Sequence, residues 1–166
     1  MQKLIKHRQL TDDPWVLVKE ATDPGILQAL PGRNLIVPHR FWKYFQDDIA
    51  NYWGQVTIWL NSDEYVGDIR EPLETFPVIG LNFPVFSDGR SYTNARELRE
   101  QFGYKGEIRA IGDVLRDQLY YMHRCGFDAF QLRHDQDPEA CLRAFDDFQD
   151  SYQAAIDQPQ PLYRRR

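Results

Sequence analysis

Short runs of alternating apolar and polar residues recur along the chain from about residue 34, separated by stretches in which apolar residues have helical spacing. The runs that predict strands are residues 35–37, 56–60, 78–83, 107–111 and 129–133. Strands that alternate with helices in this way are typical of βαβ units and of a parallel sheet. The pattern therefore predicts an α/β protein.

Each predicted strand has one apolar side and one polar side. Ile58 and Leu60, for example, alternate with Trp59. A sheet that helices cover on both faces would show nearly continuous apolar strands instead. We therefore expect a partial (β/α) barrel-like parallel sheet with helices outside, and an open flavodoxin-like α/β sandwich is the alternative. The expected concave face is lined by Trp59, Asn82, Arg109, Gln131 and Arg133.

The predicted helices have apolar stripes and recognisable ends. Asp113 is a candidate cap for a helix that Gly126 ends, and Asp137 followed by Pro138 indicates the start of another. Two further helices are expected over residues 38–50 and 91–102. The residues expected to face inward include Phe41, Phe45, Ile49, Leu98, Phe102, Cys141, Phe145, Phe148 and Tyr152.

We expect one α/β domain over residues 1–166, in three parts. Residues 1–33 form an N-terminal β segment, with antiparallel strands over 3–8 and 15–19 and a turn at Asp12, Asp13 and Pro14. Residues 34–152 hold the βα units. Residues 153–166 form an extended C-terminal arm, because they contain two prolines and end in three arginines. This arm is either a solvated tail or a docking peptide for an acidic partner.

Composition excludes several classes of function. The formal net charge of −5 argues against binding to nucleic acid. No apolar run approaches the roughly 18 residues of a membrane span, so we expect a cytoplasmic protein that does not associate with membranes. The two cysteines have no CxxC spacing and the four histidines show no ligand pattern, so we expect reduced thiols and no metal site.

Loops after the strands are the places to look for chemistry, because ligands collect at the carboxyl ends of parallel strands. In the loop before the helix at Ser91, Gly89 permits close approach and Arg90 supplies a cation for an oxyanion, although Asp88 or Ser91 could simply cap the helix. Asp113 and Arg116 follow the next strand in the same way, with capping and a surface ion pair as the alternatives.

Arg109 and Arg133 are expected on strands, where an arginine needs a carboxylate, a bound anion, a wet cleft or a partner. The candidates for anion or partner binding are therefore Asn82, Asp88, Arg90, Arg109, Asp113, Arg116 and Arg133. A carboxylate site built from Asp88, Asp113 and Asp117 is a weaker alternative. GxSxG, P-loop and GxGxxG motifs are absent, so no complete catalytic centre is visible and the enzyme question stays open.

Several blocks of the sequence resemble a bacterial family numbered 934 among the domains of unknown function. The blocks are DGRSY at 88–92, GYKGEIRAIGDVLRDQL at 103–119, RCGFDAF at 124–130, YQA at 152–154 and DQP at 157–159. The resemblance covers roughly residues 77 to 166, and the first 75 residues match only loosely.

This family is typically encoded beside the haemoprotein subunit of assimilatory sulfite reductase, and its members are often labelled as oxidoreductases. The resemblance therefore implies an accessory protein of sulfite reduction that assists electron supply, assembly or substrate delivery. Sirohaem and an iron–sulfur cluster would then belong to the partner, the sulfite reductase haemoprotein, with no cofactor on this chain. The alternatives are a small barrel-like enzyme acting on an anionic metabolite and a purely structural subunit, and a homodimer is compatible with each.

Overall fold

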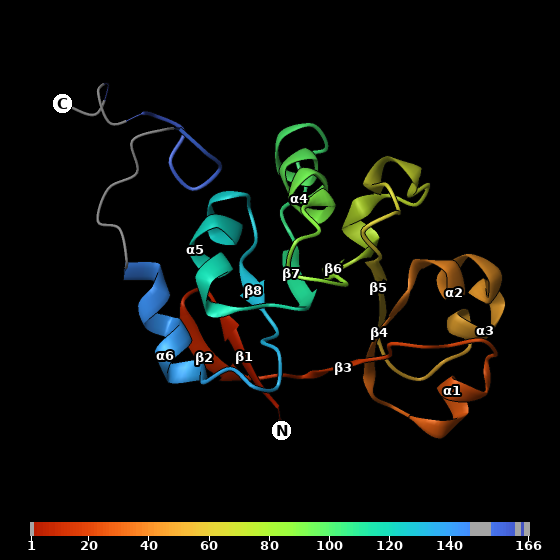
Figure 1. The fold of residues 1–166 in the computed structure, drawn as a ribbon. Helices are drawn as coiled ribbons and strands as arrows, with labels where there is room; N and C mark the ends of the chain where they lie inside the picture. The colour runs from red at the N-terminus through yellow and green to blue at the C-terminus, as the bar shows by residue number, and fades with distance from the viewer. Residues whose placement is uncertain (1, 147–153, 162–163, 165–166) are drawn as a thin grey trace.

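A computed structural model describes residues 2–146, 154–161 and 164 of the chain. Its centre is one sheet of eight strands, in the spatial order β2-β1-β8-β7-β6-β5-β4-β3 (Figure 1). The strands are β1 Lys3–Lys6, β2 Gln9–Asp12, β3 Trp15–Leu17, β4 Asn34–Pro38, β5 Val56–Leu60, β6 Val78–Phe83, β7 Glu107–Gly112 and β8 Ala129–Phe130. The run β3 to β8 is parallel, whereas β1 lies antiparallel to both β8 and β2.

The two edges of the sheet are consecutive in the chain. Only Asp13 and Pro14 separate the end of β2 from the start of β3, although these strands lie at opposite ends of the strand order. A flat sheet could not satisfy this connection, so the sheet curls until its edges approach each other. The fold is therefore the expected α/β partial barrel, and the open sandwich is excluded.

Helices cover the convex face of the sheet (Figure 1). The α-helices are α1 Gly25–Ala29, α2 His39–Tyr44, α3 Gln46–Ala50, α4 Arg90–Glu100, α5 Arg116–Arg124 and α6 Pro138–Leu142, and 3₁₀ turns span Val66–Asp68, Leu73–Thr75 and Arg143–Asp146. The apolar side of the strands packs under them, with Ile58, Leu81 and Ala110 fully buried in one core. The predicted alternation of apolar and polar positions is thus explained by the two faces of one curved sheet.

The other face is concave and holds the polar members of the alternation. In the register of the central strands, Trp59 lies beside Gly80, and Gly80 lies beside Arg109. Residues paired across a sheet point to the same side. A Cβ atom on Gly80 would come within 2.8 Å of the Trp59 Cβ, so the close approach of Trp59 favours glycine here.

The N-terminal segment differs from the sequence prediction. Asp12 ends β2 instead of opening a turn, and the hairpin turn lies at His7 and Arg8, which have positive φ angles of 49° and 63°. β3 pairs parallel with β4, and no described segment pairs with it antiparallel. Asp13 and Pro14 form the link between the two sheet edges. The sequence shows them only as a local turn signal, because the link can be recognised only from the strand order.

Several boundaries also differ. Asp113 does not cap a helix, because α5 begins at Arg116, and the Arg116 amide donates to the Gln136 Oε1 at 3.1 Å. The expected helix over residues 38–50 is two helices, and Phe102 is 43% exposed instead of inward. β8 ends at Phe130, so Arg133 lies in a loop. Asp137 does cap α6, accepting from the Glu139 and Ala140 amides, whereas Phe148 and Tyr152 lie outside the described residues.

Candidate functional site

The carboxyl ends of the parallel strands surround a cleft. Two hollows of about 310 and 280 Å³ lie there and share Lys19, Glu20 and Trp59 in their walls. The indole of Trp59 is held in place because its Nε1 donates to the Val18 carbonyl at 2.9 Å. The cleft therefore has a fixed aromatic wall and charged side chains of both signs.

Two of the predicted residues line this cleft. Asn82 and Asp113 both contribute to the smaller hollow. The Asn82 Nδ2 donates to the Asn61 Oδ1 at 2.9 Å, and the Asp113 carboxylate lies 3.8 Å from the Arg133 guanidinium. Asn82, which was expected on the concave face, and Asp113, which was expected in a loop after a strand, therefore lie at one opening, and Arg133 contacts Asp113 beside it.

A third hollow, of about 330 Å³, lies at the seam where the two edges of the sheet approach each other. Asp13, Trp15 and Arg33 line it from one side and Gln131 from the other. Lys19 belongs to this hollow as well as to the two others. Its side chain is exposed, and no carboxylate of the described residues lies within ion-pair distance of its amine. Lys19 is thus a free cation at the centre of the opening.

Asp88 and Arg90 form a closed cluster next to this opening. The Arg90 Nε and Nη2 contact the two Asp88 oxygens at 3.0 and 2.7 Å, and the buried Ser62 hydroxyl donates to Asp88 at 2.7 Å. These hydrogen bonds hold the pKa of Asp88 well below its usual range, with the Arg90 contact contributing most. The guanidinium proposed for an oxyanion is therefore already satisfied by a carboxylate, which an incoming anion would have to displace.

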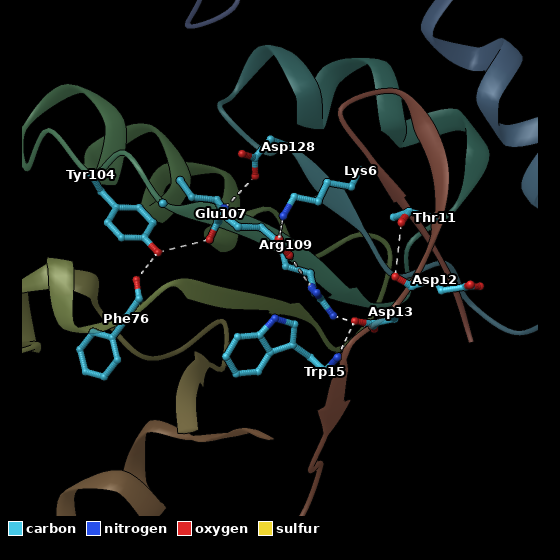
Figure 2. Close-up of polar contacts among 12 residues, drawn as sticks. Lys6, Thr11, Asp12, Asp13, Trp15, Phe76, Tyr104, Glu107, Arg109 and Asp128 are labelled. Carbon is cyan, nitrogen blue, oxygen red and sulfur yellow. Dashed lines mark hydrogen bonds and ion pairs between the residues drawn. The ribbon is translucent and has the colours of Figure 1, made fainter. Parts of the chain in front are cut away.

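Arg109 lies inside the concave face, where it is completely buried (Figure 2). Its Nη1 contacts Asp13 at 2.8 Å and its Nε contacts Glu107 at 2.8 Å, while Lys6 reaches the second Glu107 oxygen at 2.6 Å. Of the alternatives expected for Arg109, pairing with carboxylates is the one found, and the expectation that it lines an open concave face is corrected, because the link between the sheet edges covers it. Its Nη2 has no hydrogen-bond partner among the described residues.

The remaining two arginines also have partners. Arg116 Nε donates to the Ala140 carbonyl at 3.2 Å and so fastens α5 to α6. Arg133 forms a two-pronged contact with Asp135, both distances being 2.7 Å, which lowers the pKa of Asp135 well below its usual range. The seven predicted residues therefore separate into two that line the cleft, one that pairs with Asp113 beside it, two in the adjacent cluster, one between helices and one in the interior.

The described residues offer little for covalent or redox chemistry. Cys125 and Cys141 are buried, and burial raises the pKa of each thiol, so neither is an activated nucleophile. Burial likewise lowers the pKa of His39 and of His123. Within residues 2–146, 154–161 and 164, no three His, Cys, Asp or Glu side chains are placed to hold a metal ion, and no helix could cross a bilayer.

Sequence reasoning missed Asp13, Lys19 and Trp15 as members of the site. Asp13 carries an ordinary turn signal, and its partner Arg109 is 96 residues away, so no local pattern joins them. Lys19 lies two residues after the end of β3, and the rule of strand ends could have found it had this strand been assigned to the parallel sheet.

Fold and cleft together define a curled α/β half-barrel with a polar opening at its strand ends. The chain belongs to a family of bacterial proteins of unknown function, DUF934, whose model matches residues 57–163. No curated protein and no solved structure matches the chain. The matched region contains Trp59, Asn82 and Asp113, whereas Asp13 and Lys19 lie before it.

Proposed function

We propose that this protein is a cytoplasmic accessory component of assimilatory sulfite reduction, which binds the haemoprotein subunit of sulfite reductase at the strand-end opening. The sirohaem and iron–sulfur cluster belong to that partner, and this chain assists electron supply, assembly or substrate delivery. The resemblance of residues 77–166 to the family supports the pathway. The surface beside the cleft supports a binding role.

The observation that carries the binding role is a pair of exposed apolar side chains in the loop between β6 and α4. Val85 is 51% exposed and Phe86 is 61% exposed. The loop is held in position, because the Gln118 Nε2 donates to the Phe86 carbonyl at 2.7 Å and the Asp88 cluster closes its other end. A fixed loop that presents apolar side chains beside charged ones is typical of protein–protein contacts.

Co-purification from the native host tests this proposal. Tagged wild-type protein is expected to retain the haemoprotein, and Phe86→Ser is expected to lower the recovered amount at least about tenfold, because central aromatic residues dominate interfaces. Phe102→Ser is the matched control, because Phe102 is also an exposed phenylalanine but lies beyond the other end of α4.

A deletion strain gives the functional readout. Growth on sulfite as the sulfur source is expected to fall after deletion and to return with Phe102→Ser but not with Phe86→Ser. The proposal is wrong if the haemoprotein does not co-purify with the wild-type chain and the deletion strain grows normally.

A second candidate is a small enzyme that acts on an anionic metabolite. The Lys19 amine, which lines three adjoining hollows, favours this candidate because it could bind the anion. Asp113 lines one of these hollows and would act as the general acid or base. If it is correct, Lys19→Met abolishes the stabilisation of the protein by the bound metabolite in thermal-shift screens, while co-purification of the haemoprotein is unaffected. Sulfite, sulfate and small carboxylates are the first compounds to screen.

A further inference from the structure

A fourth hollow lies away from the strand-end opening, between α1 and the end of α3. Its volume is about 250 Å³, and its walls include Pro24, Pro31, Asp48, Tyr52 and Trp53. Trp53 is 86% exposed, which is unusual for the largest apolar side chain. The site described above uses none of these residues.

The walls of this hollow are fixed by hydrogen bonds. The Tyr52 hydroxyl donates to the Leu30 carbonyl and also lies 2.7 Å from the Arg33 carbonyl, while the Arg33 amide donates to it at 3.0 Å. Trp53 packs near Gly32, whose positive φ of 71° suits glycine. The Tyr52 ring is therefore fixed in the wall, and Trp53 lies beside it against Gly32.

One donor of this surface has no acceptor among the described residues. No hydrogen bond within the described part of the chain involves the Trp53 indole nitrogen, whereas those of Trp42 and Trp59 both donate. A groove of tryptophan, tyrosine and proline with a free indole N–H is the chemistry that holds extended proline-containing segments, where a ring packs on the proline and the N–H binds a backbone carbonyl. Asp47 and Asp48 on α3 add negative charge beside it.

We infer that this groove, defined by Pro24, Pro31, Asp48, Tyr52 and Trp53, binds the C-terminal arm of a second copy of this chain. The arm supplies Gln-Pro-Gln-Pro at 158–161 and three arginines at 164–166, which match the apolar rings and the acidic flank respectively. Pro159 and Gln160 are exposed and so are accessible to a partner molecule.

The geometry favours a second copy over the same chain. The arm begins on α5, where the Ile156 amide donates to the Arg124 carbonyl at 3.1 Å and Asp157 pairs with Arg124 at 3.3 Å. α5 lies at the opposite end of the molecule from α1 and α3 (Figure 1). The arm therefore leaves its own domain far from its own groove, and the contact joins unlike surfaces of two molecules.

Titration of a synthetic peptide of residues 158–166 into a chain that ends at Asp157 tests the groove directly. Calorimetry is expected to show binding that weakens at least about tenfold with Trp53→Ala, and by a similar factor when both peptide prolines are replaced by alanine. Asp48→Asn is expected to weaken binding several-fold and to reduce its dependence on salt. Tyr44→Ser is the control, because Tyr44 is 77% exposed but does not line the groove.

Sedimentation of the full chain gives the second measurement. Self-association that rises with concentration is expected for the wild type and is expected to be lost both with Trp53→Ala and when residues 158–166 are removed. The inference fails if the peptide shows no binding at millimolar concentration, if Trp53→Ala binds it equally well, or if self-association persists without the arm. Circular dichroism verifies that each surface variant is folded.

Discussion

The guanidinium of Arg109 shows what a buried charge requires. Transfer of an unpaired cation to a protein interior costs several kcal/mol, so it must meet carboxylates with good geometry. Asp13 and Glu107 supply them at 2.8 Å each, and Lys6 balances the second oxygen of Glu107. Two cations and two anions thus form one neutral group beneath the link between the sheet edges.

Arg109→Met is expected to destabilise the protein by about 3–5 kcal/mol, because it leaves two carboxylates in the interior without their main partner. Lys6→Met removes a cation whose side chain is 38% exposed and is expected to cost about 1 kcal/mol or less. Urea unfolding followed by circular dichroism measures both. If the two variants lose the same free energy of unfolding, the buried ion pairs of Arg109 do not stabilise the protein more than the exposed Lys6 does.

His39 predicts a dependence of stability on pH. Burial lowers its pKa below the ordinary 6.5, Lys43 lowers it further, and Glu64, Glu71 and Asp68 oppose the shift. Between pH 6.5 and the lower folded pKa, the unfolded chain therefore binds more protons, so the free energy of unfolding falls as the pH falls. The slope for one such group is at most about 1.4 kcal/mol per pH unit.

His39→Gln is expected to flatten this slope, measured as unfolding midpoints across the same pH window. The slope does not vanish, because burial also lowers the pKa of His123. His134→Gln is the matched control, since His134 is exposed and its replacement should leave the wild-type slope. An unchanged slope with His39→Gln would contradict the assignment.

At the scale of elements, two glycines that end or follow regular structure differ in their surroundings. Both Gly103 after α4 and Gly112 at the end of β7 have positive φ angles, of 62° and 89°. A Cβ atom on Gly103 would meet nothing within 4 Å, whereas one on Gly112 would overlap Asn82 Oδ1 and the Phe83 carbonyl.

Gly103→Ala is therefore expected to cost about 1–2 kcal/mol, the usual penalty for a left-handed alanine. Gly112→Ala should cost clearly more, because it adds a clash at the wall of the cleft. Thermal unfolding of the two variants measures the difference. If Gly112→Ala destabilises the protein no more than Gly103→Ala does, β6 and β7 do not approach each other at the cleft as closely as described.

The sequence predicted the central strands well for a physical reason. The strands 56–60 and 78–83 match the observed bounds, because their apolar positions face one helix layer and keep a strict period of two. β2 was missed, because Asp12 and Asp13 look like a turn and only pairing with β1 makes a strand of residues 9–12. Asp113 was assigned as a cap from its residue type, but α5 starts three residues later.

The site was predictable to the extent that it follows from strand ends. The rule that loops meet at the carboxyl edge indicated Asp113, and the alternation of the strand indicated Asn82 on the concave face; both line the cleft. The burial of Arg109 was not predictable, because it depends on Asp13, a residue from the opposite edge of the sheet. Contacts of this kind arise only after the sheet has curled.

At the scale of the whole molecule, the matched family region does not contain the complete sheet. It begins at residue 57, whereas β1 to β4 lie before it. A chain that starts at Gln55 would expose the edge of β5, remove Ile5 from beside Phe130 and leave Arg109 without Asp13.

Such a shortened chain is expected to lose cooperative thermal unfolding and near-ultraviolet circular dichroism, because the half-barrel cannot close its interior. The full chain is the reference. A sharp unfolding transition in the shortened chain would show that residues 55–166 form an independent unit.

The brevity of the connection between β2 and β3 has a mechanical consequence. Two residues of fully extended chain span at most about 7 Å, so Asp13 and Pro14 leave almost no slack. Force that separates the N-terminal hairpin from β3 must first draw the Asp13 carboxylate away from Arg109. Tension applied to the edge strands is thereby transmitted to β7 in the middle of the sheet.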